Sequence, residues 1–259
     1  MPEVTRAPEL TVVVPCFDEE RRLDRARLLA FADEPGISLL FVDDGSRDRP
    51  RAVVEELAKA KPGRISVLGL DRNGGKGEAV RRGLVRALEG GARIVGYVDA
   101  DLSTPPDEVL RLRSELDASG VSVVVGSRVQ LVGRRIERRN SRHMLGRVFA
   151  TVAARILETP FYDTQCGAKL FRDVPALRAA LAEPFRSRWA FDVELLGRLL
   201  VGVGGEAGLP VTEFLEVPLR TWIDAPGSKV DFAGMARSLV DLARIDAELA
   251  RLRKGKGRP

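Results

Sequence analysis

Two carboxylates separated by one residue are the clearest chemical feature of the sequence. Asp99-Ala100-Asp101 directly follows the apolar run IVGYV at 94–98, which has the composition of a buried strand. Alternate side chains of an extended backbone point to opposite faces, so one carboxylate can reach a metal ion while the other supports it. Paired carboxylates together with phosphate oxygens usually hold a hard ion such as Mg²⁺ or Mn²⁺. The triplet therefore predicts a metal site at Asp99 and Asp101, although Asp-x-Asp alone is common by chance.

Acidic residues also follow two earlier apolar runs, VVVP and LLFV. Asp18 comes shortly after the first run, and the pair Asp43-Asp44 comes directly after the second. In an open parallel sheet the ligand crevice lies beyond the carboxyl ends of the strands, so these side chains are expected at one edge. Taken singly, Asp18, Ser46 and Ser103 have the residue types of helix caps, and that alternative stays open.

The segment LDRNGGKGEAVRRGL at 70–84 combines three glycines with a lysine before an expected helix. Gly74, Gly75 and Gly77 offer backbone amides and Lys76 offers a cation. Together with the helix N-terminus they predict a phosphate site. The spacing is not that of a Walker loop. The alternative is an ordinary glycine turn that carries a surface lysine.

Apolar runs alternate with amphipathic stretches in the first half of the chain. Repeated strand-helix-strand units indicate an α/β fold with a mainly parallel sheet covered on both faces. The expected strands lie at 10–15, 37–42, 65–70, 94–98 and 121–126, with helices near 19–32, 49–61, 75–90 and 106–119. After residue 127 we expect a helix near 142–157, an apolar run at 167–171, a helix near 191–203, a strand near 211–219 and an amphipathic helix from about 231 to 252.

Basic charge is concentrated in two places. The chain has 42 basic and 37 acidic residues, and the five cations from Arg251 onward equal the net charge of +5. Seven arginines lie between Arg128 and Arg147 beside one acid, Glu137. Such a cluster suits an anionic partner, or is a solvated loop. The last helix and its basic tail are suited to an anionic membrane surface, although a helix that packs on the domain is the commoner arrangement.

Composition excludes several classes of protein. The 259 residues suffice for one large domain, and no run approaches eighteen apolar residues. The N-terminal residues lack a secretory pattern, so we expect a cytoplasmic protein, peripheral at most to the cytoplasmic face of a membrane. Cys16, Cys166 and His143 are too few for a disulfide framework or a zinc cage. Any metal is therefore expected on oxygen ligands.

The combined motifs resemble the family-two glycosyltransferases of the GT-A fold. The resemblance covers about residues 9–230 and rests, in order, on VVVPCFDEE, FVDDGSRD, LDRNGGKGEAVRRG, DADLSTPPDE, VVGSR, DTQCGAKLF, WAFDVELL and SKV at 228–230. It implies a Rossmann-like three-layer fold, with a catalytic domain at 1–230 and an amphipathic helix with a basic tail at 231–259. Within the family the chain looks like the branch that acts on dolichyl and polyprenyl phosphates. DTQCG followed by WAFDVELL resembles its glucosyl members, which favours a UDP-sugar over GDP-mannose.

Carried over by position, the resemblance implies a role for several residues. Asp99 and Asp101 would hold the metal and the diphosphate. Arg128 would meet the acceptor phosphate, with Arg142 favoured over Arg138 and Arg139 as its partner. Asp192 and Glu194 would line the sugar and acceptor region. The implied donor contacts are Pro15, Asp18, Asp43, Asp44, Asp71, Lys76, Asp99, Asp101 and Gln165.

The resemblance therefore implies inverting, metal-dependent transfer of a hexose, glucose in the first instance, from a UDP-sugar to a polyprenyl phosphate. Three alternatives stay open. The same fold can serve a hydroxyl acceptor, with Asp192 or Glu194 as the base. A nucleic-acid-binding protein would use the arginines and the tail, and would bind with a steep salt dependence. A catalytically silent nucleotide-sugar sensor would bind the donor without turnover.

Overall fold

The structure is a computed structural model that describes residues 9–19, 22–46, 50–137, 140–224 and 232–256. The side chains at 50–52, 140–145, 232–239 and 256 also lie outside the description. The predicted positions Arg138, Arg139, Arg142 and His143 are therefore not described as side chains.

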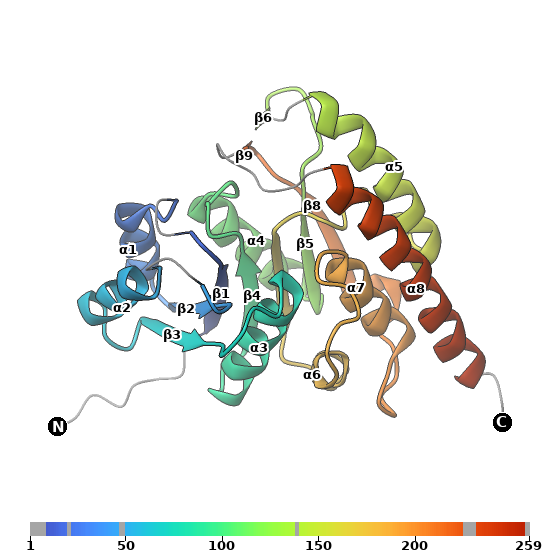
Figure 1. Cartoon of the computed structure of the whole chain (residues 1–259), viewed down its shortest axis with the longest axis horizontal. Coiled ribbons are helices and arrows are strands. Elements are labelled where there is room, and N and C mark those ends of the chain that lie inside the picture. Colours follow the sequence, from blue (N-terminus) through green and yellow to red (C-terminus); the bar gives the residue numbers. More distant parts are fainter. Residues whose placement is uncertain (1–8, 20–21, 47–49, 138–139, 225–231, 257–259) are drawn as a thin grey trace.

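A seven-stranded sheet runs through the molecule (Figure 1). Its strand order is β3-β2-β1-β4-β7-β5-β8, and every neighbouring pair is parallel except those made by β7. The chain order reverses between β1 and β4, which is where ligands bind in open α/β sheets. The strands are β1 (Leu10–Cys16), β2 (Ile37–Asp43), β3 (Ile65–Gly69), β4 (Ile94–Val98), β5 (Val123–Ser127), β7 (Ala168–Arg172) and β8 (Phe214–Pro218).

Helices cover both faces of the sheet and make the fold three-layered. Val12 and Val14 of β1 pack into the core under one set of helices, and Val13 packs into the core under the other, as the period of two requires. The first set is α1 (Arg25–Asp33), α2 (Pro50–Ala60) and α4 (Pro106–Ser119). The second set is α3 (Lys76–Glu89), α5 (Asn140–Leu157), α6 (Pro175–Ala182), α7 (Phe191–Val201) and α8 (Phe232–Lys256). The predicted α/β fold with a mainly parallel sheet is confirmed.

Several elements differ from the sequence prediction. The apolar run at 167–171 forms β7, which is antiparallel to both of its neighbours. Helix α1 begins at Arg25 and not near 19, because the Asp24 side chain caps it by accepting from the Arg27 amide at 3.1 Å. The short elements α6, η1 (Val211–Glu213), β6 (Arg135–Glu137) and β9 (Thr221–Ile223) were not predicted.

The described part of the last helix packs on the domain. Leu242, Ile245 and Leu249 of α8 are each 1% exposed. Leu249 lies so close to Gly197 of α7 that a Cβ atom there would be 2.4 Å from it. Where the side chains of α8 are described, from residue 240 onward, its apolar face is therefore buried against α7 and does not face outward. Among the described residues, no helix combines the length and apolar character needed to cross a membrane.

Candidate active site

The ends of β1 and β2 are tied together at the carboxyl edge of the sheet. The Asp44 amide donates to the Cys16 carbonyl at 2.9 Å, and the Asp18 amide donates to the Ser46 hydroxyl at 3.2 Å. The Ser46 amide in turn donates to the Asp43 carboxylate at 3.1 Å. Ser46 and Asp18 thus join two strand ends, and neither caps a helix, so the cap alternative is wrong for both.

Asp44 holds the glycine loop. Its two oxygens accept the amides of Gly74 and Gly75 at 2.7 and 2.8 Å, and the residue is 2% exposed. Burial raises the pKa of Asp44 above its ordinary value, while the two amides oppose that shift. The Gly77 amide donates to the Arg188 carbonyl at 3.1 Å. The predicted phosphate cradle is therefore wrong in this respect, because these amides already have acceptors within the protein.

Only glycine fits at position 75. The residue takes a φ of +90°, and a Cβ atom there would lie 2.5 Å from Nε of Arg188. Gly75 is thus required by the packing of the loop against Arg188.

Lys76 and Asp99 form an ion pair at the start of α3. Burial opposes the charge of Lys76, but Asp99 and Asp192 together raise its pKa above the ordinary value. Gly167, in the loop before β7, lies against the other side of Asp99, and a Cβ atom there would be 2.1 Å from Oδ2 of the carboxylate. The Asp99 carboxylate is therefore held between the Lys76 ammonium group and the backbone of Gly167, which has no side chain.

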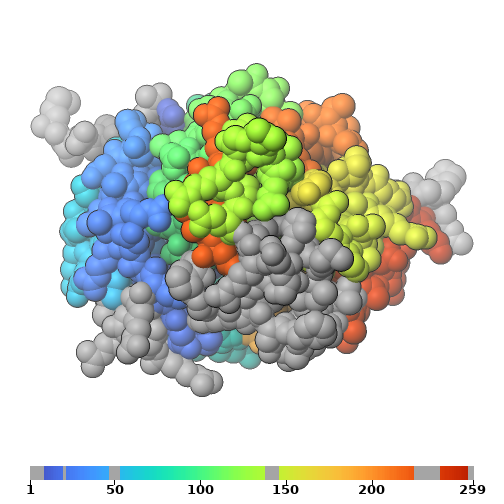
Figure 2. Space-filling view, turned by 90° about the horizontal axis from the view of Figure 1, so that it is seen from above, coloured from blue at the N-terminus to red at the C-terminus, as the bar shows by residue number. Residues whose placement is uncertain are grey.

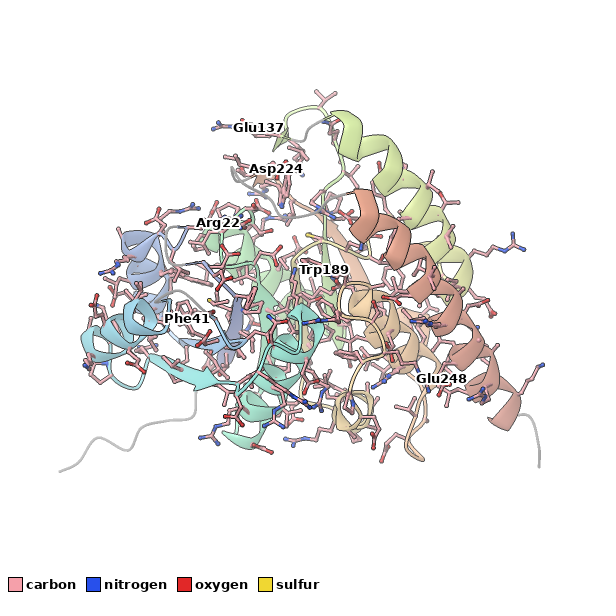
Figure 3. The ribbon with its side chains drawn as sticks, in the orientation of Figure 1. Arg22, Phe41, Glu137, Trp189, Asp224 and Glu248 are labelled. Carbon is pink, nitrogen blue, oxygen red and sulfur yellow. The ribbon has the colours of Figure 1, made fainter. Side chains whose placement is uncertain are left out.

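Asp101 is fixed by two contacts. Its Oδ1 accepts the Ser103 amide at 3.0 Å, so Ser103 is a turn residue and not the cap of α4. Its Oδ2 accepts Nη2 of Arg22 at 2.8 Å, and Nη1 of Arg22 lies 3.0 Å from Glu19. Figure 3 shows Arg22 on the upper side of the molecule, above the labelled Phe41. Arg22 carried no signal in the sequence, because its partner is 79 residues away.

The donor set at this edge suits a hard divalent ion. Asp99 and Asp101 offer only oxygen, and the described residues contain no group of three or more His, Cys, Asp or Glu side chains able to hold a metal ion. A metal here would need further ligands from a bound diphosphate, as is usual for Mg²⁺. It would also compete with Arg22 for Asp101.

Arg128, directly after β5, is paired within the protein. Its Nε and Nη2 donate to the two oxygens of Asp163 at 2.7 and 2.8 Å, and its guanidinium carbon lies 5.3 Å from the ring centre of Trp222 in β9. Burial opposes the charge, but Asp163 more than compensates and raises the pKa of Arg128. The Asp163 amide donates to Glu216 at 2.7 Å, which fixes the acidic partner. The sequence predicted that Arg128 binds a phosphate, but it did not predict that Asp163 is paired with the same guanidinium.

A cleft opens beside this pair, between α5 and the loop before β7. Nη1 of Arg147 and Oγ1 of Thr164 are buried there without a hydrogen-bond partner. The Arg147 guanidinium lies 4.0 Å from the ring centre of Tyr162, which holds it in place. Two unpaired donors in one cleft favour an anion, because a buried donor without an acceptor is costly. The cleft is narrow, with a volume of about 30 Å³, and is lined by Arg128, Gly146, Arg147, Phe149, Ala150, Tyr162, Asp163, Thr164 and Gln165.

Asp192 and Glu194 of α7 are not open to a substrate. Asp192 is 4% exposed, accepts from Lys169 at 2.6 Å and also bonds the Tyr97 hydroxyl. Burial and Asp192 raise the pKa of Tyr97 well above its ordinary value. Glu194 is 2% exposed and uses its two oxygens on Arg198, at 2.7 Å, and on a backbone amide of the preceding loop, at 2.8 Å. The structure thus corrects the expectation that these acids line the acceptor region.

The remaining predicted residues are distributed around the same edge. Gln165 lines the cleft, two residues before Gly167. Pro15 is half-buried within β1, and Asp71 is exposed after β3. Residues that the sequence did not single out are Arg22, Arg147, Asp163, Thr164 and Gly167, of which the last three belong to the motif DTQCG.

A parallel sheet that gathers acidic side chains at its switch point defines a class of nucleotide-binding α/β enzymes. The family model for glycosyl transferase family 2 matches residues 11–178, and the chain belongs to that family. It is therefore a glycosyltransferase.

Relatives and solved structures agree with this assignment. A dolichyl-phosphate beta-glucosyltransferase of Dictyostelium discoideum is 29% identical over 252 residues, which cover 91% of this chain and 73% of that protein. A polyprenol monophosphomannose synthase of Mycolicibacterium smegmatis is 27% identical over 212 residues, covering 82% of this chain and 80% of that protein. Among solved structures, glucosyl-3-phosphoglycerate synthase from Mycobacterium tuberculosis in complex with Mn²⁺, UDP and glucosyl-3-phosphoglycerate has a TM-score of 0.62 at 19% identity, covering 93% of this chain and 80% of that one. This last likeness concerns the fold, and the predicted GT-A architecture is confirmed.

Proposed function

We propose that this glycosyltransferase moves a hexose, glucose in the first instance, from a UDP-sugar to a polyprenyl phosphate. The observation that carries the proposal is the cationic cleft beside the carboxylate edge. Asp99 acts electrostatically on Arg128, and Gln165 of the cleft is two residues from Gly167, which touches Asp99. The names of the relatives, which act on dolichyl and polyprenyl phosphates, support the same acceptor class.

On the donor side, Asp99 and Asp101 are the proposed ligands of Mg²⁺ or Mn²⁺. The ion, when bound with the donor, would neutralise the departing diphosphate. Lys76 adds a second positive charge at the same edge and orients the Asp99 carboxylate. Asp43 and Asp18, at the ends of the neighbouring strands, are the proposed contacts of the nucleoside.

On the acceptor side, Arg147 and Thr164 are the proposed phosphate contacts. Arg128 acts through a shared pair with Asp163, which leaves Arg147 as the cleft cation without a carboxylate partner among the described contacts. An acceptor phosphate, with a second pKa near 6, is largely ionised at neutral pH and needs no base. One of its oxygens would form the bond to the anomeric carbon as the bond to the diphosphate breaks, so UDP leaves with the electron pair and the configuration inverts.

The burial of Asp192 and Glu194 argues against a hydroxyl acceptor. Such an acceptor needs a base within hydrogen-bond reach, and both acids are committed to buried partners. GDP-mannose stays the alternative donor, since one relative is a mannose synthase by name. Membership of the glycosyltransferase family argues against nucleic acid as the partner of the arginines. Nucleotide sugars and a lipid-borne acceptor would meet at the cytoplasmic face of a membrane, where we expect the enzyme to act.

A donor and acceptor screen tests the proposal. Calorimetry with Mn²⁺ should show UDP binding at least about tenfold tighter than GDP, a difference of about 1.4 kcal/mol. Turnover of UDP-glucose should require a polyprenyl phosphate and should be absent with the matched polyprenol. Chelator should abolish turnover, and Asp101→Asn should do so without lowering the melting temperature greatly. Tighter GDP binding would replace the donor assignment, and transfer to the polyprenol would replace the acceptor assignment.

A further inference from the structure

A tight turn at residues 131–134 exposes two adjacent apolar side chains. Val132 is 105% exposed and Leu131 is 48% exposed. The Arg134 amide donates to the Leu131 carbonyl at 3.0 Å, and Gly133 takes a φ of +79°. A Cβ atom on Gly133 would meet nothing within 4 Å, so the turn stands clear of neighbouring atoms. Turns usually carry polar residues, and this one offers apolar surface to whatever lies outside.

Exposed arginines surround the turn. Arg134 and Arg135 follow it, and the Arg135 amide donates to the Arg220 carbonyl at 2.8 Å, so three exposed arginines lie together. In the small sheet that follows the turn, Arg135 of β6 lies opposite Thr221 of β9, while the half-exposed Ile223 lies at the far end, opposite Glu137. In Figure 2 the lime-green segment before α5 stands at the surface beside the orange segment that contains β9.

Two acids lie at the other end of the small sheet. Glu137 pairs with Arg135 at 2.7 Å, with side-chain exposures of 52% and 68%, and Asp224 follows β9. Figure 3 shows both acids near the top of the molecule. Against these two acids the three arginines leave a surplus of one positive charge, and the exposed pair between Arg135 and Glu137 is weak enough to open toward a headgroup.

We propose that residues 131–134 form a membrane-docking tip, which inserts Leu131 and Val132 into an anionic lipid bilayer while Arg134, Arg135 and Arg220 contact the headgroups. The two apolar side chains suit the hydrocarbon interior of the bilayer, and the flanking arginines suit the negatively charged headgroups above it. The apolar face of α8, which the sequence made the first candidate for membrane contact, is buried where the structure describes it.

The tip lies close to the cationic cleft. Val132 is four residues from Arg128, so the two are at most about 14 Å apart along the chain. Trp222 of β9 lies against the Arg128 guanidinium, which attaches the small sheet to the cleft wall. Interfacial segments insert about 5–10 Å, and the headgroup layer is about 7 Å deep, so a separation of at most about 14 Å is compatible with a cleft near the level of the lipid phosphates.

Vesicle partitioning of the full chain tests the tip. The probes are phosphatidylcholine vesicles with and without phosphatidylglycerol, at low and high salt. The variants are Leu131→Ser/Val132→Ser and Arg134→Gln/Arg135→Gln. Val211→Ser is the matched control, since Val211 is 53% exposed but precedes β8 at the opposite end of the strand pair β5 and β8. Val240→Ser, 55% exposed, is the control on α8.

The serine variant of the tip should lower the partition coefficient on anionic vesicles at least about tenfold, with both controls within twofold of wild type. The arginine variant should lose binding to anionic vesicles and the salt dependence that accompanies it. Unchanged binding of the serine variant, an equal loss in Val211→Ser, or a change in oligomeric state in place of vesicle binding would overturn the proposal. Calorimetric UDP binding, measured on the same samples, reports folding and separates a failure of the tip from a failure of the proposed reaction.

Discussion

Replacement of Gly167 by alanine should disable the carboxylate edge. The new Cβ atom would lie 2.1 Å from Oδ2 of Asp99, whereas real Cβ contacts stay beyond 3.0 Å, so the carboxylate must retreat by about 1 Å. Forced overpacking of this kind costs about 1–3 kcal/mol. For a chain of this size that corresponds to a fall of roughly 2–12 °C in melting temperature.

The effect on the proposed reaction should exceed the effect on stability. Metal-ligand distances tolerate only about 0.2 Å, and a misplacement of about 1 Å costs on the order of a hundredfold in rate. Mn²⁺-dependent UDP binding by calorimetry and turnover should therefore both fall in Gly167→Ala below its melting temperature. Gly255→Ala is the control, because a Cβ atom near the end of α8 meets nothing within 4 Å. Wild-type Mn²⁺ affinity and turnover in Gly167→Ala would refute the reasoning.

Three further perturbations address neighbouring contacts. Arg22→Gln removes the cation that competes with a metal ion for Asp101. Because a partly exposed ion pair is worth at most about 1 kcal/mol, Mn²⁺ binding should tighten by up to about fivefold. Weaker Mn²⁺ binding would instead make Arg22 a contact of the nucleotide-sugar donor. Arg147→Gln should raise the KM for a polyprenyl phosphate roughly thirtyfold, about 2 kcal/mol, without changing the affinity for UDP. The control Arg155→Gln, at an exposed position, should leave the KM unchanged. An equal effect of both substitutions would exclude the cleft as the acceptor site. Burial raises the pKa of Cys166 from 9.0 to about 11, so between these pH values the native state keeps a proton that the unfolded chain releases. The free energy of unfolding should therefore fall by up to about 2.7 kcal/mol as the pH rises from 9 to 11. Denaturant titrations should show a smaller fall in Cys166→Ala, and an identical fall would contradict the assignment.

The strand ends that carry the site could be predicted from the sequence, because the signals for strands and turns are local. The apolar runs that form β1, β2 and β4 are rich in Val, Ile and Leu and end at acidic residues, so their place in a parallel sheet follows from periodicity and turn chemistry. The motif order also identified the family. The direction of β7 could not be predicted, because a five-residue apolar run says nothing about which neighbours it pairs with. The three-residue strands β6 and β9 are too short to leave a pattern.

Residue types determined which chemistry was available at the edge, and the tertiary structure decided which groups were left to perform it. The sequence predicted that the amides of Gly74 and Gly75 face a phosphate, but Asp44, about thirty residues earlier, already accepts both. It assigned the acceptor phosphate to Arg128, and the structure pairs Arg128 with Asp163, 35 residues later. Hydrogen bonds form only within about 3.2 Å, so the partners of a charge depend on how distant segments pack and are not written in its immediate neighbours.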